Sequence, residues 1–158
     1  MDTKTAASKG NRERGAESLS HVLADTYVLY LKTHAYHWNV TGPHFASLHL
    51  LFETQYNELH AAADIIAERI RALGVYAPGS YGAFAKLASI KEDNDMVPAA
   101  MNMVRNLVSG HEALGRTLRA AFKTAEADGD QVTMDMLIGR MDAGDKAAWM
   151  LRSHLEGA

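Results

Sequence analysis

Apolar side chains recur every three or four residues over a long stretch in the middle of the chain. The series consists of Phe45, Leu48, Phe52, Tyr56, Leu59, Ala63, Ile66, Ile70 and Leu73. This spacing places all of them on one side of an α-helix. Pro43 precedes the series and Gly74 follows it, and these are positions that the two residues favour at helix ends. The stretch therefore predicts one long amphipathic helix.

Three other segments share this period, and no segment shows the alternating pattern of a β-strand. The apolar positions run through residues 97–125, through 137–155 and, less regularly, through 16–38. Pro98 lies at the start of the segment 97–125, and Gly129 lies just past its end. Both positions again suit helix termini. The chain is therefore predicted to contain four long helices and no sheet.

The connections between these helices differ in length. Residues 39–43 and 127–129 form short links, whereas 74–96 is long for a connection within a bundle. Within that long link, AFAKLASI predicts a short helix through Phe84 and Leu87. We predict an all-α fold, a four-helix bundle of the ferritin-like kind with a short extra helix in the crossover between helices 2 and 3.

Length and composition agree with a single domain. The chain has 158 residues, 47% of them hydrophobic, which suffices for one core. Residues 1–14 are polar and small and are expected to form a flexible tail, with the bundle spanning 15–158. No apolar run is long enough to cross a membrane or to serve as a signal peptide, so a cytoplasmic location is expected.

The net charge argues against one class of function, and the absence of cysteine excludes one class of metal site. The formal net charge is −3, which argues against a generally basic nucleic-acid-binding domain. The chain has no cysteine, so it has neither disulfides nor thiolate metal sites. Any bound metal must be held by imidazole, carboxylate or water, a ligand set that suits iron, manganese or zinc.

Histidines and acids share one row beside the apolar stripe of the long helix. His49 and Glu53 are four residues apart, as are Asp64 and Glu68, so each pair is stacked on the same side of the helix. His37, at the end of the preceding helix, is expected to lie beside His49 and Glu53 after a short turn. Each residue alone has an ordinary interpretation as a capping or surface residue, but the shared row favours a metal site.

One helix cannot bring both pairs to one metal. His49 and Asp64 are about 22 Å apart along the axis at 1.5 Å per residue, whereas each ligand must lie about 2 Å from the ion. If a second copy of the helix packed antiparallel about a two-fold axis, His49 of one chain would meet Asp64 of the other. The sequence therefore predicts a metal site that is split between two subunits. Five other histidines are interpreted as packing, capping or surface residues: His34, His44, His60, His111 and His154.

The residues that form this row also resemble a known family. The segment HWNVTGPHFASLH from His37, followed by FETQY and by ADIIAERI up to Ile70, is similar to the Dps proteins, or miniferritins. The match includes His-Trp-Asn, a glycine five residues after that histidine, a second histidine twelve after it, and Asp-x-x-Ala-Glu-Arg. DKAAW at residues 145–149 is a weaker likeness to the last helix of the family.

The resemblance implies a hollow homododecamer that oxidises Fe(II), preferably with hydrogen peroxide, and stores Fe(III) as a mineral core. Its ferroxidase centre would take His37, His49 and Glu53 from one subunit and Asp64 and Glu68 from its neighbour. Glu53 departs from the family pattern, since many relatives have aspartate there. The ligand type is unchanged, but the longer side chain alters the expected metal spacing.

Two further sets of residues are assigned roles by the resemblance. Trp38, next to His37, is expected to quench a stray oxidant by donating an electron, and interface packing is an equally good interpretation. Asp128, Asp130 and Asp135 would line a three-fold pore that draws cations inward. For Asp130, turn or N-cap chemistry is the better interpretation.

Two rival functions remain open from the sequence. The first is a nucleoid protein whose tail binds DNA through four basic residues, Lys4, Lys9, Arg12 and Arg14, with twelve tails acting together. The second is a structural bundle that binds zinc or no metal. Oxidation of Fe(II) by peroxide or oxygen, followed by absorbance, separates both from the ferroxidase.

Overall fold

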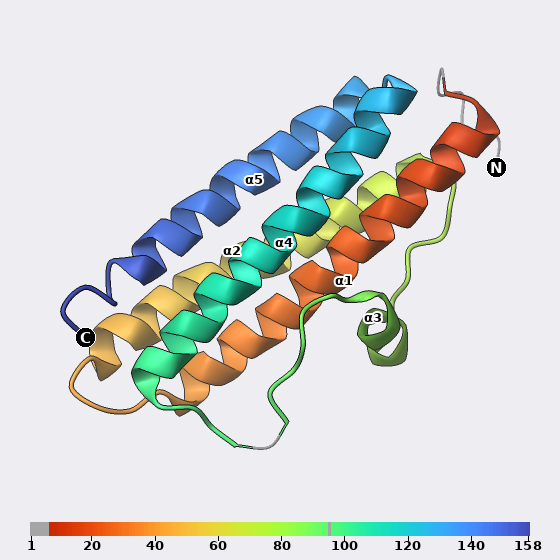
Figure 1. The fold of residues 1–158 in the computed structure, drawn as a ribbon. Helices are drawn as coiled ribbons and strands as arrows, with labels where there is room; N and C mark the ends of the chain where they lie inside the picture. The colour runs from red at the N-terminus through yellow and green to blue at the C-terminus, as the bar shows by residue number, and fades with distance from the viewer. Residues whose placement is uncertain (1–6, 95) are drawn as a thin grey trace.

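The computed structural model describes residues 7–94 and 96–158, and five helices account for most of them (Figure 1). They are α1 (Lys9–Asn39), α2 (Phe45–Ala72), α3 (Tyr81–Leu87), α4 (Ala100–Asp128) and α5 (Gln131–Arg152). The described residues contain no strand, so the predicted all-α fold is confirmed. None of these helices has the length and apolar character needed to cross a membrane.

The four long helices form the bundle, and α3 lies beside it within the crossover (Figure 1). α1 packs against α2 and α4, and α5 packs against α4. The crossover after α2 runs back along the bundle before α4 begins, so α2 and α4 point in the same direction. The predicted long crossover and its short helix are therefore both present.

The core contains the apolar stripes that the sequence pattern predicted. Phe52, Leu59 and Ile66 of α2 and Leu107 and Leu118 of α4 are almost completely buried, together with residues of α1 and α5. α4 begins at Ala100, just after Pro98, because proline cannot donate the backbone hydrogen bond that a helix interior needs. α4 ends at Gly129, whose φ of 68° is the left-handed conformation that glycine adopts most easily.

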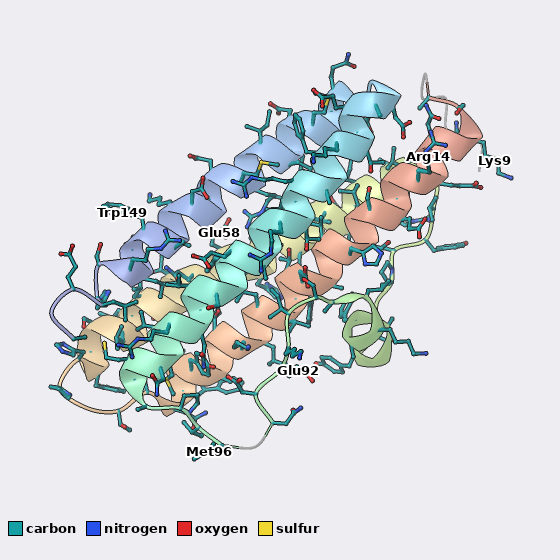
Figure 2. All side chains as sticks on the ribbon, viewed as in Figure 1. Lys9, Arg14, Glu58, Glu92, Met96 and Trp149 are labelled. Carbon is teal, nitrogen blue, oxygen red and sulfur yellow. The ribbon has the colours of Figure 1, made fainter. Side chains whose placement is uncertain are left out.

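α1 begins earlier than the sequence pattern predicted. It starts at Lys9, so residues 9–14 of the predicted tail are helical, and the bundle does not begin at residue 15. Ser8 caps the helix by accepting a hydrogen bond from the backbone N–H of Asn11 at 3.2 Å. Arg14 forms an ion pair with Asp128 at 2.7 Å, which ties this end of α1 to the end of α4 (Figure 2). Residues 1–6 of the predicted tail lie outside the described residues.

Asp25 attaches the crossover to the bundle. Its carboxyl oxygens are fully buried on α1 and accept hydrogen bonds from the backbone N–H groups of Ser89, at 2.6 Å, and Ile90, at 3.1 Å. The hydroxyl groups of Ser89 and Thr117 of α4 donate to the same carboxyl group at 2.7 and 2.6 Å. One side chain thus joins α1, the crossover and α4.

His111 lies on the buried side of α4. Its side chain is 5% exposed, and neither ring nitrogen has a hydrogen-bond partner among the described residues. Burial lowers its pKa to about 4; nearby Glu58 acts in the opposite direction, and Arg140 adds to the decrease. The folded protein therefore holds this imidazole neutral at physiological pH.

We predict that replacing Asp25 with alanine loosens the crossover and destabilises the fold by about 3 kcal/mol, because two backbone N–H groups and two hydroxyls lose their acceptor. Urea unfolding measures the loss. Asp142→Ala on the exposed side of α5 is the control and should change stability by less than about 0.5 kcal/mol. Equal stabilities for the two variants would contradict this role for Asp25.

We also predict that His111 makes stability depend on pH. The folded-state pKa lies below the ordinary value of 6.5, so the unfolded chain binds the proton more readily and stability falls as pH decreases from about 6.5 towards 4. Between pH 7 and pH 5 this loss amounts to about 2 kcal/mol. His111→Leu should remove that part of the dependence, and His154→Leu should retain it. Denaturant unfolding at both pH values measures the difference, and identical slopes in all three proteins would refute the assignment.

Candidate metal centre

His37 and His49 face each other where α1 and α2 are joined. Their rings stack with centroids 3.8 Å apart and planes inclined by 15°. His37 lies in the last turn of α1 and is 9% exposed, and His49 is half-buried in the second turn of α2. The five-residue link between the helices is short enough to hold the two rings together, as the sequence predicted for this pair.

Each ring donates a hydrogen bond to the other residue's backbone. Nδ1 of His37 donates to the carbonyl oxygen of His49 at 2.7 Å, and Nδ1 of His49 donates to the carbonyl oxygen of His37 at 2.8 Å. A carbonyl oxygen only accepts, so both Nδ1 atoms carry the proton. In the neutral rings, both Nε2 atoms therefore have a free lone pair. Metal-binding histidines have this arrangement, in which the second nitrogen donates to a carbonyl or a carboxylate.

The acids do not complete a site within one chain. Glu53 follows His49 by one turn and is half-buried, whereas Asp64 and Glu68 are exposed near the other end of α2. Within residues 7–94 and 96–158, no three histidine or acidic side chains come together as a metal-binding group. The rise of the helix keeps the two halves apart, and one chain presents two separate sets of candidate ligands.

Aromatic side chains surround the histidine pair. The ring of Tyr56 is 5.2 Å from that of His37 and 4.0 Å from that of His34. Trp38 is 59% exposed, and its ring lies 4.2 Å from that of His34. Burial lowers the pKa of His34, and the nearby His37 and His60 lower it further. The position of Trp38 permits both of its predicted roles, electron donation and packing against another subunit.

The sequence predicted a packing, capping or surface role for His34 and a place in the apolar stripe for Tyr56, but not that both rings lie beside the histidine pair. His34 is four residues before Trp38, and Tyr56 is seven after His49, so both lie at helical spacing from candidate site residues. That spacing is the signal that identifies them, although an aromatic residue at such a position is usually part of the core.

The three acids assigned to a pore have different surroundings. Asp128 is paired with Arg14, and Asp130 is paired with Arg69 at 2.9 Å. Asp130 is also the N-cap residue of α5, where its side chain accepts a hydrogen bond from the backbone N–H of Thr133. Burial raises the pKa of Asp130, but the hydrogen bonds from Thr133 and Arg69 outweigh it, so the pKa is lowered. Asp135 is exposed.

The basic residues assigned to DNA are largely engaged at the start of α1. Arg12 donates to the carbonyl oxygen of Ala7 at 2.8 Å. Arg14 is held by Asp128, and Lys9 lies 3.7 Å from Glu13. Lys4 falls outside the described residues. The described part of the proposed DNA-binding segment is therefore an ordered helix end whose cations have partners.

Comparison with known proteins places the chain in a family. A model of the ferritin-like domain matches residues 16–158. The DNA protection during starvation protein of Brevibacillus brevis is 38% identical over 139 residues, which cover 87% of this chain and 92% of that protein. A low temperature-induced protein of Nostoc sp. is 48% identical over 140 residues, or 88% of this chain and 78% of the relative.

Solved structures show the same fold. A Dps protein from Vibrio cholerae, described as a ferritin-like diiron-carboxylate protein, superposes with a TM-score of 0.91 at 29% identity, with 98% of each chain covered. DpsC from Streptomyces coelicolor gives a TM-score of 0.95 at 28% identity, covering 98% of this chain and 91% of that one. The chain therefore belongs to the ferritin-like proteins, and within them to the Dps family.

Proposed function

We propose that this protein oxidises Fe(II) at a centre shared by two copies of the chain and stores the ferric product inside a hollow homododecamer. The observation that carries the proposal is the reciprocal hydrogen bonding of His37 and His49, which leaves both Nε2 atoms free to bind a metal. Membership of the ferritin-like family supports it. The chemistry of the ligands suits iron, because carboxylates with a minority of imidazoles bind Fe(II) and also the harder Fe(III).

In this proposal, each centre combines the two sets of ligands, which come from the end of α1 and from α2. His37, His49 and Glu53 come from one subunit, and Asp64 and Glu68 come from its partner across a two-fold axis. Large apolar side chains are exposed on α2 near both sets, with Leu50 at 60% and Ile65 at 54%. An apolar surface beside polar ligands is expected at a face that a second subunit covers.

The proposed reaction uses hydrogen peroxide as the preferred oxidant, with oxygen as an alternative. Two Fe(II) ions each lose one electron, and peroxide accepts both electrons with two protons to form two water molecules. Because two electrons leave together, hydroxyl radical is not released. Trp38 would supply an electron to an oxidant that escapes this route, and its exposed position beside His34 supports this role. The protein would thus protect DNA and the cell from oxidative stress in the bacterial cytoplasm.

The rival function as a DNA-compacting protein has less support. The net charge is −3, and three of the four basic residues assigned to DNA contact partners within the chain. Relatives bear the name DNA protection during starvation protein, and oxidation of iron would itself protect DNA without contact. The ferroxidase is therefore the function that the geometry favours.

The shared centre predicts rescue between two inactive variants. His37→Ala with His49→Ala removes one half of every centre, and Asp64→Ala with Glu68→Ala removes the other half, so each variant alone should oxidise Fe(II) very slowly. When the two are assembled together from equal amounts, half of the two-fold interfaces are mixed and each regains one intact centre of two. Roughly a quarter of the wild-type rate should return.

The measurement is Fe(II) oxidation with hydrogen peroxide, followed by absorbance. Pull-down through a tag on one variant establishes that both chains are in one particle. A mixed particle that stays as inactive as its parents would show that the centre is not shared between subunits, and the proposed function would lose its main support.

The proposed pore predicts a rate effect that depends on iron concentration. Asp128 and Asp130 are held by arginines, so Asp135 is the acid whose replacement disturbs the fold least. Asp135→Asn keeps the size and removes the charge, so oxidation should slow severalfold at limiting Fe(II) and recover at high Fe(II). Asp142→Asn, exposed on the same helix, is the matched control. Equal rates for all three proteins at low iron would place iron uptake elsewhere.

A further inference from the structure

His60 lies in the row of proposed metal ligands, although the sequence alone gave it only a packing, capping or surface role. At about 100° per residue, its direction around α2 falls between those of His49 and Asp64. It precedes Asp64 by one turn, and its side chain is exposed. A histidine at this position faces the same partner as the ligands on either side of it.

The surroundings of His60 within the chain leave its ring available. The Tyr30 ring is the nearest aromatic neighbour, with centroids 5.0 Å apart. His60 and Asp64 line an open groove of about 710 Å³, together with Tyr27 and Phe84. The described residues form no hydrogen bond with the imidazole of His60, in contrast to His37 and His49, whose Nδ1 atoms are both engaged.

The position of His60 relative to the two-fold axis follows from the pairing of the ligands, and this step rests on the proposed function. If His49 lies opposite Glu68 and Glu53 lies opposite Asp64 of an antiparallel partner helix, the axis crosses α2 between residues 58 and 59. His60 is then about 2 Å from the axis along the helix, and the two copies of His60 are about 4.5 Å apart in that direction. Helices that pack together are separated by about 8–10 Å, so two imidazoles from facing helices meet midway.

We propose that His60 and the partner's His60 bind one divalent transition-metal ion on the two-fold axis, midway between the two ferroxidase centres. Two neutral imidazoles favour ions of intermediate softness such as Zn²⁺ and Co²⁺. The same register places Asn57 opposite the partner's His60. The side-chain amide of Asn57 donates to the carbonyl oxygen of Glu53 at 3.0 Å, which leaves its own amide oxygen free as a further ligand. The site takes one ion per pair of subunits.

Counting bound Zn²⁺ in the assembled particle tests this site. Equilibrium dialysis against Zn²⁺ should show that His60→Gln binds about half an ion per chain less than the wild type. His154→Gln, just past the C-terminal end of α5 and half-buried, should bind as much as the wild type. In the His37→Ala and His49→Ala background, where both histidine ligands of the ferroxidase centre are removed, about half an ion per chain should remain and should disappear when His60→Gln is added.

The outcomes separate this proposal from the ferroxidase. If His60→Gln binds as many ions as the wild type, the axial site is refuted while the ferroxidase stands. If the His37→Ala and His49→Ala variant binds as many ions as the wild type, the ferroxidase centre fails. Proximity is tested independently with His60→Cys, because the chain has no other cysteine. A short bis-maleimide should link pairs of chains into dimers on a denaturing gel, and chains that remain single would overturn the proposed pairing.

Discussion

The candidate metal centre depends on the two hydrogen bonds that His37 and His49 exchange between rings and backbone. They hold the end of α1 against the start of α2, because each ring is hydrogen-bonded to the backbone of the opposite helix. They also fix the tautomer of both rings, so that the nitrogen that faces away from the backbone is the one with a lone pair. The carbonyl group of His37 lies in the last turn of α1, where it has no partner within the helix. The hydrogen bond from His49 therefore satisfies a carbonyl group at the end of α1, and the two bonds together leave both Nε2 atoms available as candidate metal ligands.

The second constraint is the rigidity of α2. Ligands at both ends of a straight helix point to one side of the molecule but remain far apart along it, and no adjustment of side chains closes such a gap. A chain with this arrangement gains a complete centre only by using a second copy of itself, in antiparallel orientation. In the proposed shared centre, function and assembly are linked by geometry, and the residues between the two halves, including His60, would form the middle of the interface.

Much of the fold could be predicted from the sequence, and the failures have physical causes. α2 and α4 were predicted well because each buries one face, which imposes a regular apolar spacing. The start of α1 was missed because residues 9–14 are polar on every side, and their helix is stabilised by the Ser8 cap and by the Arg14–Asp128 pair, which leave no periodic signal. Asp25 could not be recognised as the anchor of the crossover, because its partners are 64 to 92 residues further along the chain.

For the site, the sequence predicted the pairing of His37 with His49 but not the details that make it useful. The reciprocal backbone contacts depend on how the two helices approach, which no spacing reveals.

The attachment of the crossover has a further consequence for engineering. Asp25 accepts hydrogen bonds from the backbone of Ser89 and Ile90. Residues 91–94, just beyond, are exposed, and Glu92 in this stretch is labelled in Figure 2. Asp93 in this stretch accepts a hydrogen bond from the hydroxyl group of Tyr36 on α1. A peptide inserted at Glu92 that keeps Asp93 in place would retain both this contact and the Asp25 anchor, so this bend is a natural position at which to display foreign sequence on the protein.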